Sequence, residues 1–282
     1  MKSASLVLVA ALTLASAAPA AAQAPAGDWR TPDPQNVLVV DTNKGRIIVE
    51  LEPRVAPRHV ERYRDLARQG FYNGLSFFRV IDGFMNQTGD PKNDGTGGSS
   101  LPNLQIEIPY RRGADAPVVV VGKLAPDAEV PAVTEVGFVG VMPVRGAPSM
   151  QMMMNADGKA PVWGLFCAGV LGAARSGDPD SANSQFYFMR DTYPSLNANY
   201  TAFGRVIAGQ DVVRAIKVGE PVAAPQDTMT KVQVLADMPE AQRPKIQVMD
   251  TAGPAFRAMV DKLAAGGRAV DPCALEIPAK VS

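Results

Sequence analysis

Residues 71–98 read FYNGLSFFRVIDGFMNQTGDPKNDGTGG, and this stretch decides how the rest of the sequence is interpreted. Aromatic and β-branched residues dominate positions 75–81, between an Asn-Gly and an Asp-Gly turn dipeptide, which is the pattern of a short β-strand. Arg79 lies inside this run. Because a guanidinium is always charged and is rarely buried without a partner, Arg79 should either meet a carboxylate or line a groove open to solvent and ligand.

On either side of this stretch, the chain alternates short apolar runs with turn signals. A β-hairpin is expected over 37–51, around the turn at 42–45. Helices are expected after Pro57, over 211–217 and after Pro254, where apolar residues recur at helical spacing. Many short strands and few helices predict a mainly β fold, an antiparallel barrel or sandwich with helical lids.

The first residues have the pattern of a targeting segment. Residues 1–22 combine Lys2, an apolar run and a small-residue cleavage site, so they are predicted to be a signal peptide. Residues 23–35 are rich in proline and lack periodicity, which predicts a flexible lead-in. No later run is suited to crossing a membrane. We therefore expect an exported soluble protein, periplasmic or secreted, without stable membrane insertion.

Charge and cysteine content limit the possible partners. Lys+Arg and Asp+Glu both number 28, so no basic surplus argues for nucleic acid as a partner. In an oxidising compartment Cys167 and Cys273 could form a disulfide. Two separate buried thiols are the alternative, because sequence cannot place the two Cα atoms within bridging range.

Common hydrolytic and metal-dependent chemistry finds little support. The single histidine, His59, falls in the first turn of the expected helix beside charged residues, and we interpret it as a surface residue without a catalytic role. Neither an HExxH motif nor a metal-spaced cysteine pair is present. The methionines at 150 and 152–154 could bind Cu(I) through thioether sulfur, but they more often fill apolar gaps or face a partner, so no metal site is expected.

Three blocks, taken together, resemble one family. Residues 77–91 read FFRVIDGFMNQTGDP and are followed by GTGG at 95–98; residues 174–188 read ARSGDPDSANSQFYF; and residues 196–206 read LNANYTAFGRV. In this order they resemble the signature segments of cyclophilins. The resemblance covers about 36–237, apart from 111–163, which we interpret as an insertion, and it leaves 238–282 as a C-terminal extension.

The resemblance implies a fold, an activity and a site. The expected fold is a closed eight-stranded antiparallel barrel capped by two helices, with the inserted subregion and a helical C-terminal tail. The implied activity is cofactor-free cis-trans isomerisation of X-Pro bonds in proline-containing, unfolded or flexible exported polypeptides. The implied catalytic residues are Arg79 and Gln87, and the implied substrate-binding residues are Phe84, Met85, Ala174, Arg175, Gln185, Tyr187, Leu196 and Tyr200.

The sequence departs from the family pattern at several positions. Phe78 replaces a common histidine, and Tyr187 replaces a pocket phenylalanine, so its hydroxyl needs a partner or water. Ser195 stands where cyclosporin-sensitive members carry tryptophan, which predicts weak cyclosporin binding. Trp163 could fold towards the groove. Two other functions stay open: a chaperone or assembly module with little isomerase activity, and a metal-handling protein.

Overall fold

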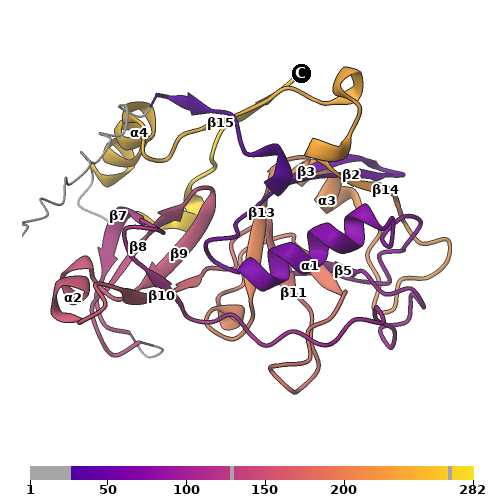
Figure 1. Cartoon of the computed structure of the whole chain (residues 1–282), viewed down its shortest axis with the longest axis horizontal. Helices are drawn as coiled ribbons and strands as arrows, with labels where there is room; N and C mark the ends of the chain where they lie inside the picture. The colour runs from indigo at the N-terminus through magenta and orange to yellow at the C-terminus, as the bar shows by residue number, and fades with distance from the viewer. Residues whose placement is uncertain (1–26, 128–129, 266–268) are drawn as a thin grey trace, which may run out of the picture.

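The computed structural model describes residues 27–127, 130–265 and 269–282, so the predicted signal peptide lies outside the described residues. Within these ranges the strands form three antiparallel sheets of eight, five and three strands. The two larger sheets lie side by side, and the C-terminal tail crosses the top of both (Figure 1).

The eight-stranded sheet carries the family motifs and is strongly curled. An isolated bridge between Ser76 and Thr228 links its two edges, but the ladder is not continuous there. The sheet is thus an open half-barrel, and the closed barrel that we expected is not confirmed. In spatial order its strands are β14 (Met229–Val234), β2 (Val37–Thr42), β3 (Gly45–Leu51), β13 (Ala202–Ala208), β11 (Val170–Ala173), β12 (Phe186–Met189), β5 (Met85–Thr88) and β4 (Arg79–Ile81).

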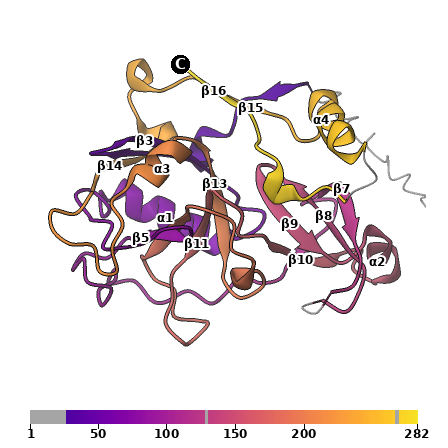
Figure 2. The same cartoon turned by 180° about the vertical axis from the view of Figure 1, so that it is seen from behind.

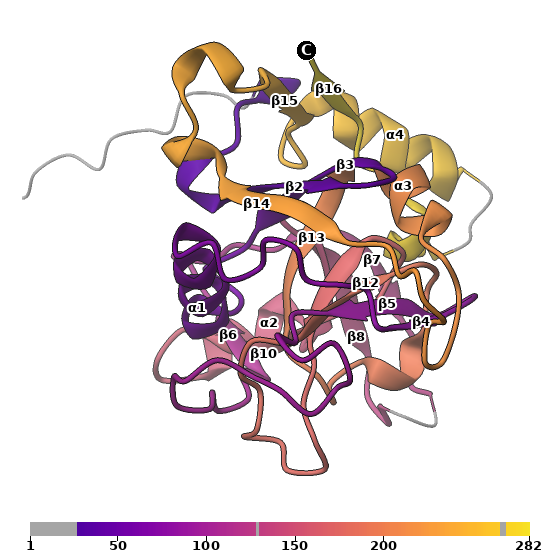
Figure 3. The ribbon, with the colours of Figure 1, turned by 90° about the vertical axis from the view of Figure 1, so that its right-hand side faces the viewer.

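Two helices contribute apolar residues to the interior of this sheet. Helix α1 (Pro57–Arg68) begins at a proline, as predicted, and buries Tyr63, which stacks on Phe203 with ring centroids 4.3 Å apart. Helix α3 (Gln210–Ala215) buries Val213 in the same core. The two helices lie on opposite sides of the curled sheet (Figure 3).

The prediction that His59 lies on the surface is wrong. Its side chain is fully buried, and its Nδ1 lies 2.6 Å from Glu107 Oε2. Glu107 also accepts hydrogen bonds from the backbone N–H groups of Arg58 and His59, at 3.1 and 3.0 Å. Because Ala56 at the N-cap offers no side-chain acceptor, this carboxylate supplies the missing cap of α1.

The inserted segment forms a sheet of its own. Its strand order is β6 (Tyr110–Arg112), β10 (Ala160–Gly164), β9 (Met142–Gly146), β8 (Thr134–Val139) and β7 (Val119–Leu124). The short helix α2 (Ser149–Met154) lies between β9 and β10. It holds the methionine cluster, of which Met150, Met153 and Met154 are exposed.

We had expected a helical C-terminal tail, but the tail contains strands as well as a helix. Helix α4 (Pro254–Ala264) begins at Pro254 as predicted, but β15 (Ile246–Met249) and β16 (Ala279–Val281) form a sheet with β1 (Trp29–Arg30) (Figure 2). The segment that we expected to be a flexible lead-in therefore contains a strand. Arg30 holds it by a two-pronged ion pair with Glu50, at 2.7 and 2.9 Å.

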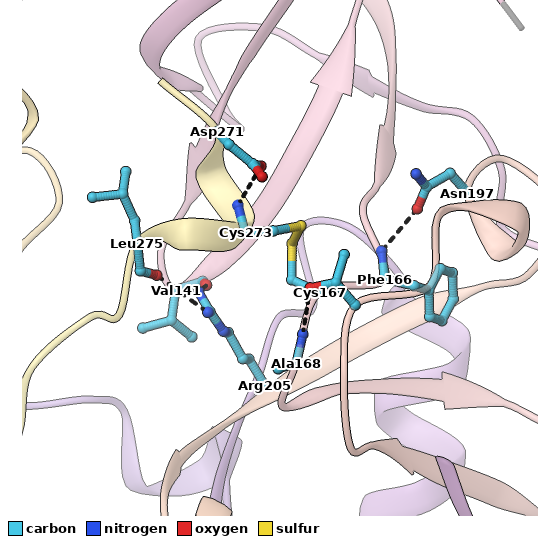
Figure 4. Close-up of a disulfide and its surroundings, with 10 residues drawn as sticks. Val141, Phe166, Cys167, Ala168, Asn197, Arg205, Asp271, Cys273 and Leu275 are labelled. Atoms are coloured by element: carbon cyan, nitrogen blue, oxygen red, sulfur yellow. Dashed lines mark hydrogen bonds between the residues drawn. A yellow bond between two sulfur atoms is a disulfide. The ribbon is translucent and has the colours of Figure 1, made fainter. Parts of the chain in front are cut away.

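A disulfide links the C-terminal tail to the segment that connects the five-stranded and eight-stranded sheets. Cys167, in the connection between β10 and β11, bonds Cys273 in the tail, so the pairing that the sequence left open is present (Figure 4). Beside it, the buried Arg205 donates to the carbonyl groups of Val141 and Leu275, both at 3.3 Å. Insertion, tail and half-barrel thus meet at one point. None of the described helices has the length and apolar character needed to span a membrane.

We predict that Glu107→Gln lowers the free energy of unfolding by about 1–3 kcal/mol at neutral pH, the range for losing charged hydrogen bonds. Burial acts to raise the pKa of Glu107, but hydrogen bonds from the His59 ring and from the backbone outweigh it, so this pKa is lowered. The stabilisation is therefore complete above the ordinary carboxyl pKa and is lost as pH falls through the lowered value. Urea unfolding at a series of pH values measures this.

The matched control is Glu61→Gln, a substitution at an exposed residue of the same helix. It should leave stability nearly unchanged. If the two variants unfold at the same urea concentration throughout the pH series, Glu107 does not stabilise α1.

Removing the disulfide should lower the stability of the folded chain. The Cys167→Ser/Cys273→Ser variant opens a covalent loop with a sequence separation of 106 residues. Chain entropy then predicts a loss of up to about 5 kcal/mol of folding free energy. Thermal unfolding followed by circular dichroism checks this: a reductant should lower the melting temperature of the unmodified protein and not that of the variant. Equal melting temperatures of both proteins without reductant would contradict it.

Candidate active site

The cross-strand register lines up residues that lie far apart in the sequence. Arg79 on β4 pairs with Gln87 on β5, Gln87 pairs with Tyr187 on β12, and Tyr187 pairs with Gly172 on β11. Directly opposed residues share one face of a sheet. Their neighbours Val80, Phe186 and Phe188 point to the opposite face and are buried in the half-barrel core. The row from Arg79 to Tyr187 therefore lies on the outer face.

A small cavity of about 90 Å³ lies over this row. Nine of the ten predicted site residues line it, including both residues predicted to be catalytic. The lining residues are Arg79, Phe84, Met85, Gln87, Ala174, Arg175, Tyr187, Leu196 and Tyr200. The structure thus brings together three sequence blocks around one apolar pocket with a guanidinium at its wall.

The tenth residue, Gln185, lies behind the polar wall. Its Oε1 accepts from Gln87 Nε2 at 2.9 Å, and its Nε2 donates to the carbonyl groups of Gly97 and Gly95, at 2.7 and 3.1 Å. These bonds orient the Gln87 amide so that its Oε1 faces Arg79 Nη1, at 3.2 Å. Gln185 positions Gln87, and its predicted contact with the peptide backbone stays a prediction.

The glycine-rich loop at 89–98 turns around one buried carboxylate. Asp90 accepts backbone N–H groups from Lys92, Asp94 and Gly95, at 2.8, 3.1 and 2.6 Å. A Cβ atom at Gly97 would overlap the Asp90 carboxylate, so this position needs glycine. The loop is therefore a rigid support for Gln185.

Sequence reasoning missed the strongest polar partner of Arg79. Its Nε donates to Glu220 Oε1 at 2.6 Å, and both side chains are partly exposed, at 37% and 54%. Arg79 thus meets a carboxylate and also lines a groove, the two outcomes that its strand position predicted as alternatives. Glu220 lies 141 residues away in a loop without a motif, so no sequence signal pointed to it.

Aromatic rings build the deep wall of the pocket. Tyr187 stacks on Phe166 with ring centroids 5.9 Å apart, and Phe166 was not among the predicted residues. The Tyr187 hydroxyl is buried, makes no hydrogen bond within the described part of the chain, and has its pKa raised well above the usual value by burial. The Tyr187 ring fits because it faces Gly172, where a Cβ atom would overlap the phenol group. Tyr187 is therefore an uncharged wall and not a base.

The open side of the pocket carries a second arginine. The guanidinium of Arg175 lies 4.2 Å from the ring centre of Tyr200, and its Nη2 donates to the carbonyl of Asn199 at 2.9 Å. Over residues 27–127, 130–265 and 269–282, no group of three or more His, Cys, Asp or Glu side chains is arranged to hold a metal ion. What the site offers is apolar burial and directed N–H donors.

Comparison with known proteins agrees with this geometry. Residues 37–236 match the family described as cyclophilin type peptidyl-prolyl cis-trans isomerase/CLD. A probable peptidyl-prolyl cis-trans isomerase of Brucella suis is 34% identical over 198 residues, covering 66% of this chain and 74% of that protein. Human peptidyl-prolyl cis-trans isomerase-like 1 is 29% identical over 196 residues, covering 70% and 86%.

A solved structure shares nearly the whole architecture. The cyclophilin AquaCyp293 from Hirschia baltica superimposes with a TM-score of 0.79 at 31% identity, covering 90% of this chain and 93% of that one. Fold and site thus define a protein of the prolyl isomerase class. The chain belongs to the cyclophilin family and is a cyclophilin-type peptidyl-prolyl cis-trans isomerase.

We predict that Glu220→Ala lowers kcat/KM for a proline tetrapeptide by about 2–5-fold, because an exposed ion pair contributes about 1 kcal/mol or less to orienting Arg79. Glu220→Gln should lose less, since its amide oxygen can still accept from Arg79 Nε. NMR exchange rates on the tetrapeptide measure both. A rate increase in Glu220→Ala would mean that the carboxylate withholds Arg79 from the substrate.

Proposed function

We propose that this chain catalyses cis-trans isomerisation of X-Pro bonds in unfolded or flexible exported polypeptides, with Arg79 as the catalytic donor and Gln87 as its partner. The observation that carries the proposal is the Arg79 guanidinium at the wall of an apolar cavity suited to a small ring. No covalent step and no cofactor are needed, because the reaction is a rotation about one C–N bond.

The donor acts on a charge that develops during rotation. Twisting the amide breaks its resonance against a barrier of about 18–20 kcal/mol, and the prolyl nitrogen then recovers a lone pair. A donor aimed at that nitrogen stabilises the twisted state more than the planar one. Within the described residues, hydrogen bonds to Glu220 and Gln87 involve Nε and Nη1 of Arg79. Nη2 remains for the substrate.

The remaining residues hold the substrate while it rotates. Phe84, Met85, Tyr187 and Leu196 bury the proline ring, and burial of apolar surface fixes one end of the rotating bond. Ala174 and Arg175 also line the cavity, and the residues before the proline would run along them. Fixing both ends of the bond orients the nitrogen towards Arg79.

An extracytoplasmic site of action has separate support. The Cys167–Cys273 disulfide fits an oxidising compartment such as the periplasm or the exterior. The predicted signal peptide points the same way. Exported polypeptides would then be the clients. Ser195, which is exposed and precedes the pocket residue Leu196, continues to predict weak cyclosporin binding.

Arg79→Ala should reduce kcat/KM for a proline tetrapeptide by about 10²–10³-fold, the usual effect of removing a donor directed at a developing charge. The matched control is Arg46→Ala, because Arg46 also lies on a strand, also donates Nε to a carboxylate at 2.6 Å and is similarly exposed. The control should isomerise normally. Equal rates for Arg79→Ala and the unmodified protein would refute the assignment.

A second candidate function is a chaperone or assembly module with little isomerase activity. It is favoured by the exposed methionines of α2, since Met150, Met153 and Met154 are 66%, 82% and 80% exposed. Flexible methionines suit contact with varied apolar partners. A client-aggregation assay discriminates: protection that survives Arg79→Ala and is lost when these methionines become serine would support this role.

A further inference from the structure

A second cavity lies next to the proline pocket, between the insertion and the turn that joins β12 and β13. Its volume is about 400 Å³, and we call it the Trp163 pocket. Two parts of the chain form it: the insertion, and the turn between β12 and β13. The lining residues are Val130, Arg145, Trp163, Pro194, Ser195, Asn197, Ala198 and Asn199.

The same turn separates the two cavities. Leu196 and Tyr200 line the proline pocket, while Ser195 and Asn197 to Asn199 line the Trp163 pocket. The turn is held on both sides: Asn197 Oδ1 accepts from the backbone N–H of Phe166 at 2.8 Å, and the Asn199 carbonyl accepts from Arg175. A polypeptide seated in the proline pocket therefore meets a fixed second cavity where its chain passes Leu196.

The lining is suited to an uncharged side chain. Trp163 is half-buried on β10 and lies directly opposite Arg145 on β9. The Arg145 guanidinium is neutralised by Asp127, at 2.7 Å, and bonded to Thr134, at 2.9 Å. The half-buried indole offers a flat face on which an aromatic ring stacks, whereas the paired Arg145 side chain is buried.

We infer that the Trp163 pocket is a second substrate subsite, which binds an aromatic side chain of the polypeptide where the chain passes Leu196. The inference rests on the proposed function, because it assumes that the substrate lies in the proline pocket. The insertion thereby gives the enzyme a preference for proline bonds that have an aromatic residue nearby.

The first test compares substrates on the unmodified protein. Longer peptides carry one phenylalanine at successive positions on either side of a single Ala-Pro bond, and an all-alanine peptide is the reference. We expect kcat/KM to rise about tenfold at one position of the series, the size of a good aromatic contact. Equal rates across the series would overturn the inference. A matched peptide carries glutamate in place of the phenylalanine. If its kcat/KM is higher than that of the phenylalanine peptide, the inference is overturned in favour of charge recognition by Arg145.

The second test uses variants of the pocket. Trp163→Ala should lose the phenylalanine preference and keep the rate on a short Ala-Pro tetrapeptide, whereas Trp163→Phe should keep both. Lys123→Ala, at an exposed position of the same insertion, is the control. If Trp163→Ala slows the short and the long peptides equally, the tryptophan is structural and the subsite is refuted. Inactivity of the unmodified protein on the tetrapeptide would instead count against the proposed function.

A binding signal that needs no catalysis completes the test. The chain has two tryptophans, so Trp29→Phe leaves Trp163 as the sole indole. Titration with the preferred phenylalanine peptide should change the Trp163 fluorescence. The Kd of the matched alanine peptide, measured in the same way, should be at least about tenfold higher. Equal affinities would show that the ring does not bind beside Trp163, even if isomerisation proves undetectable.

Discussion

The register of β4, β5 and β12 is the constraint on which the site depends. Arg79, Gln87 and Tyr187 share the outer face because their neighbours Val80 and Phe186 are held in the core. A slip by one residue would exchange the faces, placing a guanidinium in the interior and exposing phenylalanine to water. The free-energy cost of that exchange keeps Arg79, Gln87 and Tyr187 on the outer face, so one alternation of side chains specifies both the core and the candidate site.

The outer wall also explains why the insertion and the tail belong to the enzyme. One continuous apolar cluster runs from Tyr187 through Phe166 to Phe138 of the insertion and Phe256 of the tail. The last two rings meet edge to face, with centroids 5.5 Å apart. Since interiors are close-packed, a shift of the insertion would be felt at the pocket wall. The disulfide secures the same junction covalently.

Arg79 shows how a charged side chain can be held in one orientation without being buried, as its proposed catalytic role requires. Glu220 and Gln87 fix two sides of the guanidinium, and Gln185 with the Asp90 loop fixes Gln87. Each bond alone is weak at a partly exposed site. Their arrangement matters more than their sum, because a donor held in place before the bond twists does not have to reorganise during the reaction.

The family, the β-rich architecture and nearly all pocket residues could be predicted from the sequence alone, because contiguous motifs and local periodicity carry them. The sequence also predicted that Arg79 would need a carboxylate or a groove. Only the tertiary structure supplied Glu220 as that carboxylate, paired Cys167 with Cys273, and showed an open half-barrel where we expected a closed one. His59 shows the reason: a helical position predicts a surface residue, but burial was decided by Glu107, which lies 48 residues away and carries no local signal. Contacts between residues far apart in the sequence leave no local sequence pattern, whereas strands and family motifs do.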